Sequence, residues 1–152
     1  MKGFGKMKAK DYLLNIEKID MQIVNKTIEI NLLIDKLKMV AESTTSNNEG
    51  ERVQSSGSKE KMADAIACYT DLEEELKQYV ADKTEEKNEI LKTIESFPIG
   101  EYELLHKIYV QGFTLKEISI QKSCAYSTIT SLHGYAMKRL QKVLNDREKR
   151  VK

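Results

Sequence analysis

The sequence is poor in the residues that most often build metal sites, disulfides and sharp bends. Among its 152 residues there is no tryptophan, one proline and only two cysteines. Cys68 and Cys124 are far apart and match no CxxC pattern, so neither a zinc site nor a disulfide framework is predicted. No apolar run approaches the roughly 18 residues of a membrane span, and residues 1–10 lack the apolar core of a secretory signal. We therefore expect a cytoplasmic protein with no membrane partner.

The patterns that carry catalysis are also missing. The sequence has no glycine-rich phosphate loop, no Ser, His and Asp constellation, and no paired carboxylates suited to hydrolysis. Its densest acidic cluster, at residues 71–75, is consecutive along a predicted helix and spreads over several faces, which is a poor geometry for a metal ion. We predict that the protein is not an enzyme and uses no cofactor or metal.

Two long stretches, residues 8–41 and 59–96, have apolar residues at the three- and four-residue steps of a coiled coil. Pro98 ends the second stretch, because proline disfavours helical geometry in the residue before it. Between the stretches, residues 42–58 are almost entirely polar and cannot bury enough apolar surface to offset the cost of ordering. The sequence predicts a helical region over residues 1–100 that contains a flexible loop at 42–58.

Folding these two helices against each other is the simplest way to bury both apolar seams. Positions whose numbers sum to about 103 then face each other. Asp20 interrupts the first seam, and this register brings it opposite Lys83, which interrupts the second. A polar pair in a seam can fix register at some cost in stability. We predict a long antiparallel helical hairpin, while a parallel dimer of each helix stays open as an alternative.

The pattern changes in residues 101–152. A short apolar helix comes first, and Thr114 with Glu117 then has the spacing of a capping box that starts a second helix. After a turn at 122–125, a third helix is predicted from about Tyr126 to Asn145. A short helix, a tight turn and a longer helix place a recognition helix in the DNA major groove. We predict an all-α protein whose C-terminal domain, 101–152, is a three-helix helix-turn-helix.

The net charge of +1 conceals a split along the chain. Residues 1–41 carry +3, residues 42–100 carry −7 and residues 101–152 carry +5. Positive charge favours a phosphate-bearing partner, because neutralised phosphates release condensed counterions. We expect double-stranded DNA to bind the C-terminal third and to be repelled by the acidic middle.

Residues 105–140 resemble region 4 of bacterial sigma factors. The shared features are Tyr109, Gly112-x-Thr114, Glu117-Ile118, Ser127-Thr128-Ile129 and Ala136 before Leu140. The rest of the chain resembles an uncharacterised phage and prophage protein family of Gram-positive bacteria, through GERVQSSGS (50–58), KMADAIACYTDLEEEL (61–76) and Leu132-His133-Gly134. With both similarities combined, the chain resembles the phage late-gene transcriptional activators of the RinA and ArpU types.

The resemblance implies a phage-type transcriptional regulator that binds promoter DNA, with bacterial RNA polymerase as a second partner. The chain departs from the sigma pattern at Ser123, where glycine is usual, and at Ser127 and Ser131, where related helices often carry arginine. Neutral side chains contact DNA weakly, so a homo-oligomer is expected, with a dimer favoured. A small-terminase-like DNA-packaging protein and a structural coiled-coil adaptor without DNA binding stay open as alternatives.

The candidate DNA contacts fall into three groups. Outward residues at the start of the third helix are predicted to read base edges: Tyr126, Ser127, Thr128, Thr130 and Ser131. Basic residues further along are predicted to contact phosphates, which positions a protein without reading sequence: Lys138, Arg139 and Lys142. The resemblance adds a phosphate contact at the second helix: Thr114, with Lys116 beside it. His133 is predicted to be a structural histidine.

Overall fold

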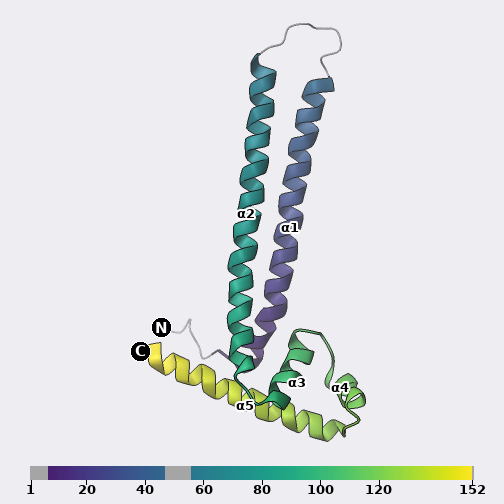
Figure 1. Ribbon diagram of the computed structural model, residues 1–152, viewed down its shortest axis with the longest axis vertical. Coiled ribbons are helices and arrows are strands. Elements are labelled where there is room, and N and C mark those ends of the chain that lie inside the picture. Colours follow the sequence, from purple (N-terminus) through teal and green to yellow (C-terminus); the bar gives the residue numbers. More distant parts are fainter. Residues whose placement is uncertain (1–6, 47–55, 152) are drawn as a thin grey trace. The chain divides into compact units, whose positions relative to one another are not determined.

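The computed structural model describes residues 7–46 and 56–151 of the chain. Regular structure in these ranges is entirely helical, so the protein is all-α, as predicted. None of the described helices is long and apolar enough to cross a membrane. The five helices are α1 (Ala9–Ser46), α2 (Ser56–Glu95), α3 (Ile99–Tyr109), α4 (Leu115–Gln121) and α5 (Tyr126–Val151), as labelled in Figure 1.

The long helices extend further than the sequence predicts. Helix α1 continues to Ser46 and α2 begins at Ser56, so both ends of the predicted loop at 42–58 are helical. The reason is that adding a residue to an existing helix is easier than nucleating one, and polar residues can continue a turn that is already formed. The middle of that predicted loop, residues 47–55, lies outside the described residues.

The chain divides into two compact units, and α1 and α2 contribute to both. The first unit contains Met1–Asp20 and Thr84–Lys152, and the second contains Met21–Lys83. The first unit therefore includes residues on both sides of position 100, where the sequence predicts a domain boundary. The ends of the two long helices belong to the same compact unit as the three C-terminal helices.

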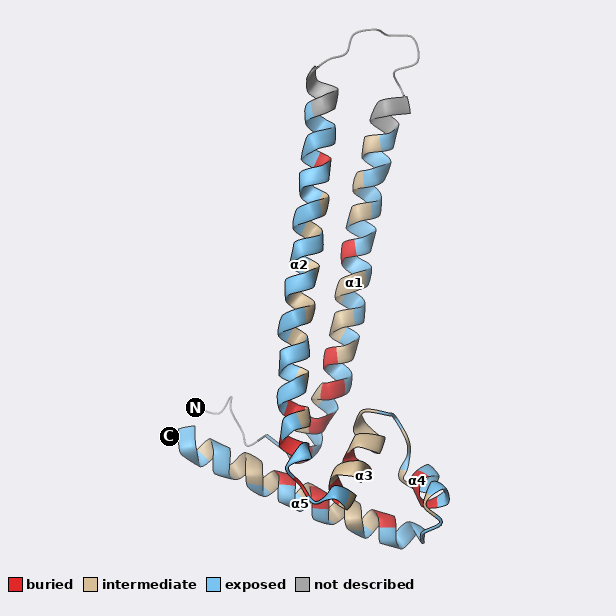
Figure 2. Ribbon diagram, in the orientation of Figure 1, coloured by how far each residue is buried: buried red, intermediate tan, exposed pale blue. Residues whose placement is uncertain are grey.

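The core of the first unit joins α3, α4 and α5. Leu104, Ile118 and Ile129, one from each helix, form a buried cluster. The partly buried side chains around this cluster are Ile108, Phe113, Leu115 and Leu132. The unit also buries side chains from the ends of α1 and α2: Leu13, Ile16, Ile90 and Ile94. In Figure 2, red segments near the base of both ribbons mark buried positions.

Helix α5 is bonded to the start of α1. The side-chain amide of Gln141 accepts a hydrogen bond from the backbone N–H of Ala9 at 2.9 Å and donates one to the carbonyl oxygen of Met7 at 3.0 Å. These contacts satisfy backbone groups that an exposed helix end leaves unpaired. One side chain of α5 therefore holds the N-terminal end of α1 in the first unit.

A second anchor explains why α5 runs to Val151 and not to about residue 145. The Arg147 guanidinium donates to the Tyr12 hydroxyl at 3.2 Å and to the Thr93 Oγ1 at 2.7 Å. Tyr12 and Thr93 also share a hydrogen bond of 3.0 Å that joins α1 to α2. The last turns of α5 are therefore ordered by contacts with two other helices.

In the first unit, contacts between α1 and α2 run in antiparallel order, because Tyr12 bonds to Thr93 and the later Asp20 pairs with the earlier Lys87. In the first unit, the Asp20 carboxylate pairs with Lys87 at 2.8 Å. The predicted partner of Asp20 was Lys83, so its ion pair lies one helical turn further along α2, within the reach of a long lysine side chain. In the second unit, Lys26 pairs with Glu75 at 3.1 Å.

Two residues with positive φ shape the connections of the C-terminal helices. Gly112 has a φ of 84°, and beyond it the N–H of Phe113 donates to the carbonyl oxygen of Lys107 at 2.9 Å. Ser123, in the turn between α4 and α5, has a φ of 51°. Only glycine adopts this region without a steric cost, so Ser123 holds the turn in a strained backbone conformation.

We expect Ser123→Gly to raise the free energy of unfolding by about 0.5–1 kcal/mol, since the relief of backbone strain exceeds the added entropy of the unfolded chain. Ser131→Gly, inside α5, is the matched control and should lower it by about 0.5 kcal/mol. Urea denaturation of the full chain measures both. A loss of stability in Ser123→Gly would contradict the strained turn.

His133 packs against Tyr109 in the first unit. The Tyr109 hydroxyl and the His133 Nε2 are 3.0 Å apart, and the two rings are stacked with centroids 6.1 Å apart. Burial, together with the positive charge of Lys10, lowers the pKa of His133, and burial raises the pKa of Tyr109. These contacts fit the structural role predicted for His133.

Because the pKa of His133 is lower in the folded state, the unfolded chain takes up this proton first. The contribution of the neutral His133 side chain to the free energy of unfolding is complete above the unfolded pKa of about 6.5. It is lost as the pH falls towards the folded-state pKa. We expect the free energy of unfolding to fall less steeply below pH ~6.5 in His133→Gln than in the wild type. Equal slopes in denaturation series at several pH values would show that His133 does not titrate in this way.

Candidate nucleic-acid interface

The start of α4 is a capping box. The backbone N–H of Glu117 donates to the Thr114 Oγ1 at 3.2 Å, and the Glu117 carboxylate accepts from the backbone N–H of Thr114 at 3.4 Å. The sequence predicts this box, and the structure confirms it. The Thr114 hydroxyl oxygen accepts in this arrangement, so its own O–H can still donate to a phosphate. Thr114 and the neighbouring Lys116 are both exposed.

The start of α5 presents most of the predicted base-reading residues to solvent. Tyr126, Ser127, Thr128 and Ser131 are exposed, while Ile129 on the opposite side is buried in the core. Tyr126 leaves 53% of its surface exposed, which is high for an aromatic side chain and suits contact with another molecule.

Thr130 differs from its neighbours, because it is half-buried and its hydroxyl is already bonded. The Thr130 Oγ1 donates to the carbonyl oxygens of Tyr126 and Ser127, each at 3.0 Å. An acceptor group on a base would have to compete with these backbone bonds. The Thr130 hydroxyl is therefore available to DNA mainly as a hydrogen-bond acceptor. The structure thus separates Thr130 from the exposed residues beside it.

The three basic residues predicted to contact phosphates do not share one environment. The Arg139 Nε donates to the Glu101 carboxylate at 2.8 Å, and the Glu101 side chain is only 7% exposed. Removing the arginine would leave a buried carboxylate without its partner, which destabilises the fold. Lys138 and Lys142 are exposed, and neither has an ion-pair partner among the described residues.

Other cations near the turn are already neutralised. Glu103 lies 3.0 Å from the Lys122 ammonium and 3.7 Å from that of Lys107. Hydrogen bonding and charge from Lys122, with a smaller part from Lys107, lower the pKa of Glu103. One carboxylate thus offsets one of the two lysine charges beside the helix-turn-helix, whereas residues 126–145 contain no acidic residue.

Two surface residues of α5 were missed by the sequence analysis. Tyr135 is 64% exposed and lines a shallow groove of about 410 Å³ with Leu132, Lys138, Lys142 and the paired side chains of Glu101 and Arg139. Gly134 lies beside it in the same turn of the helix. The signal was present, because Ser131, Tyr135, Lys138 and Lys142 recur at the steps of one helix face.

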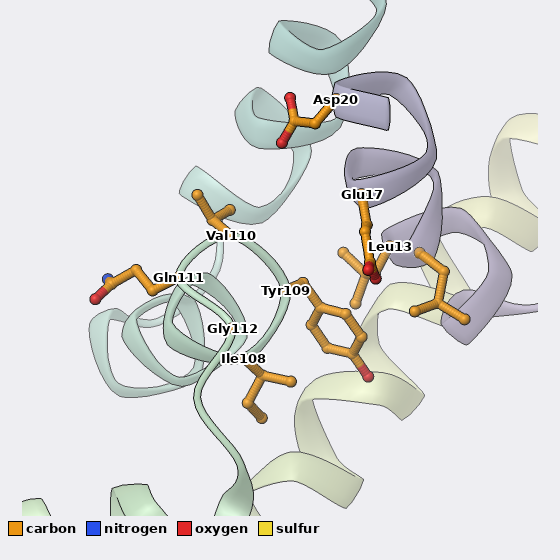
Figure 3. A pocket seen from close by; sticks show the side chains of 9 residues that line it. Leu13, Glu17, Asp20, Ile108, Tyr109, Val110, Gln111 and Gly112 are labelled. Carbon is orange, nitrogen blue, oxygen red and sulfur yellow. The ribbon is translucent and has the colours of Figure 1, made fainter. Parts of the chain in front are cut away.

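A second hollow of the first unit lies between α1 and the turn after α3, and Figure 3 shows it from close by. It is a cavity of about 400 Å³ whose lining includes Leu13, Glu17 and Asp20 from α1, with Tyr109 and Val110. The two carboxylates repel phosphate, so this cavity does not belong to the DNA-binding candidate. Among the residues that the structure describes, no group of His, Cys, Asp and Glu is placed to hold a metal ion.

The geometry therefore offers one candidate interface for nucleic acid: the start of α4 and the outward side of α5. Its hydroxyl groups, exposed aromatics and free lysines can donate to phosphates and to base edges. Comparison of the chain with protein-family models, curated proteins and solved structures finds no match.

Proposed function

We propose that the protein is a phage-type transcriptional regulator that binds promoter DNA through α4 and α5, with α5 in the major groove. The observation that carries the proposal is the outward side of α5, where Lys138 and Lys142 are exposed and free of ion pairs to any described residue, whereas Lys122 and Arg139 are each paired with a carboxylate. The exposed start of the same helix supplies the groups that read bases. The resemblance to sigma region 4 supports the same docking.

Bacterial RNA polymerase is proposed as a second partner on the ground of that resemblance. Sigma region 4 meets promoter DNA beside the polymerase, so a regulator built in the same way would act there.

The cellular location that we propose is the cytoplasm of a bacterial host. A small-terminase-like packaging role predicts a ring-sized oligomer, and a coiled-coil adaptor predicts no retention on DNA at low salt.

In this proposal the protein acts as a dimer that is held together by its second compact unit. Among the described side chains of that unit, only Ile30 and Ala65 are buried apolar residues. A two-helix unit that buries so little is not stable alone and gains from burying more surface. Five exposed apolar residues recur along one side of α1 within it, with Asp35 as a polar interruption: Met21, Val24, Ile28, Leu32 and Met39.

This α1 stripe has the spacing of a coiled-coil seam, and it lies on the side of α1 away from the one that carries Ile23, Ile30 and Ile34. The stripe can pack against the same stripe on a second copy of the chain, as a two-fold interface requires. A dimer also compensates for weak reading by neutral side chains, because two linked sites bind with a raised effective concentration.

The double variant Lys138→Gln/Lys142→Gln tests DNA binding. Each lost phosphate contact should reduce the slope of log affinity against log salt by about 0.9, on any DNA sequence. Lys38→Gln/Lys77→Gln, at exposed lysines of the second unit, is the matched control with the same change of charge. An unchanged slope in the α5 variant would rule out the proposed docking. Arg139 is left intact, because its loss would unpair Glu101.

The double variant Ile28→Asp/Leu32→Asp tests the dimer. Charges in the α1 stripe should shift the intact chain from dimer to monomer in sedimentation, and the DNA affinity should fall with it. Ala81→Asp, on an exposed position of α2 outside the stripe, is the control and should leave the dimer intact. A wild-type chain that sediments as a monomer, or a dimer unaffected by both aspartates, would show that the stripe is not the interface.

A further inference from the structure

Gly134 lies in the middle of α5, and nothing within the described structure requires a glycine there. A Cβ built at this position meets no atom within 4 Å, so crowding is not the reason. Its φ is not positive, unlike that of Gly112, so backbone conformation is not the reason either. Glycine inside a helix costs about 1 kcal/mol relative to alanine. The fold therefore carries a cost at Gly134 that no contact within it explains.

The position of Gly134 on the helix indicates what it faces. The buried residues of α5 are Ile129, Ala136 and Leu140. At 3.6 residues per turn, Gly134 lies about 140° around the helix from Ile129, on the half-buried flank that also carries Gln141, and its exposed neighbours in the adjacent turns are Ser131 and Lys138. The missing side chain thus leaves a low point at the edge of the outward side of α5, with a hydroxyl on one side and a free ammonium on the other.

We propose that Gly134 is the point of closest approach between α5 and the sugar-phosphate backbone of bound DNA, an inference that rests on the function proposed above. Without a Cβ, the helix backbone can come nearer to another molecule by about the size of a methyl group. Lys138 is placed one turn away to neutralise the phosphate that enters this space, and the Ser131 hydroxyl can donate to it.

Duplex DNA fits this low point better than a partner helix does. A helix that packed there would bury apolar residues on both sides of the glycine, as in a coiled-coil seam. The neighbours one turn away are instead Thr130 and Ser131 before the glycine and Met137 and Lys138 after it, and the two exposed ones, Ser131 and Lys138, are polar. Hydroxyl and ammonium groups are donors, and the DNA backbone is a row of acceptors.

The test is Gly134→Ala in the full chain, which should change stability and DNA binding in opposite directions. The melting temperature should rise, because alanine is the better helix former and its Cβ meets nothing. Affinity for a mixed-sequence DNA duplex at low salt should fall by about five- to tenfold, equivalent to about 1–1.4 kcal/mol. Gly100→Ala is the matched control, since that glycine is also helical with open space around it. It should leave DNA affinity unchanged.

Several results would overturn the inference in distinguishable ways. Wild-type affinity in Gly134→Ala, together with a loss of binding in Lys138→Gln/Lys142→Gln, keeps the DNA interface but removes the close approach. An equal loss in Gly134→Ala and Gly100→Ala assigns the effect to the fold. Unchanged DNA affinity with lost binding to purified bacterial RNA polymerase assigns the low point to a protein. Absence of DNA binding by the wild type removes the proposed function itself.

Discussion

Helix α5 sets the main constraint on the first compact unit, because one continuous helix has to satisfy two sets of partners. Its first turns bury Ile129 against α3 and α4, and its later turns reach the ends of α1 and α2 through Gln141 and Arg147. The residues that contact these partners cover a wide arc of the helix, because Gln141 lies about 120° around it from Ile129 and Arg147. The exposed residues Ser131, Lys138 and Lys142 lie outside this arc.

Charge in this unit follows the same division. Glu101 and Glu103 each pair with basic residues around the three C-terminal helices, and these pairs link parts of the chain to one another. Glu101 is buried, so its bond to Arg139 belongs to the fold as much as to the surface. These pairs leave the net charge of residues 101–152 at +5, and the exposed lysines without an ion-pair partner in the described ranges include Lys116, Lys138 and Lys142.

Features set by neighbours in the sequence could be predicted, and features set by distant residues could not. The capping box at Thr114 and the start of α5 at Tyr126 depend on residues a few positions apart, and both are where the sequence places them. The pairing of Arg139 with Glu101 joins residues 38 positions apart, and the burial of Glu101 has no local signal. The DNA-contacting roles of the surface residues stay predictions, because exposure permits contact but does not demonstrate it.

The two ends of α5 are coupled by its helical phase. Since each residue advances an α-helix by about 100°, one inserted residue between Ser131 and Ala136 would rotate the exposed start of α5 away from its present orientation relative to Gln141 and Arg147. An insertion of four residues nearly restores the phase while lengthening the helix by about 6 Å. The number of residues in this segment is therefore restricted, and insertions or deletions in it should occur in steps close to whole helical turns.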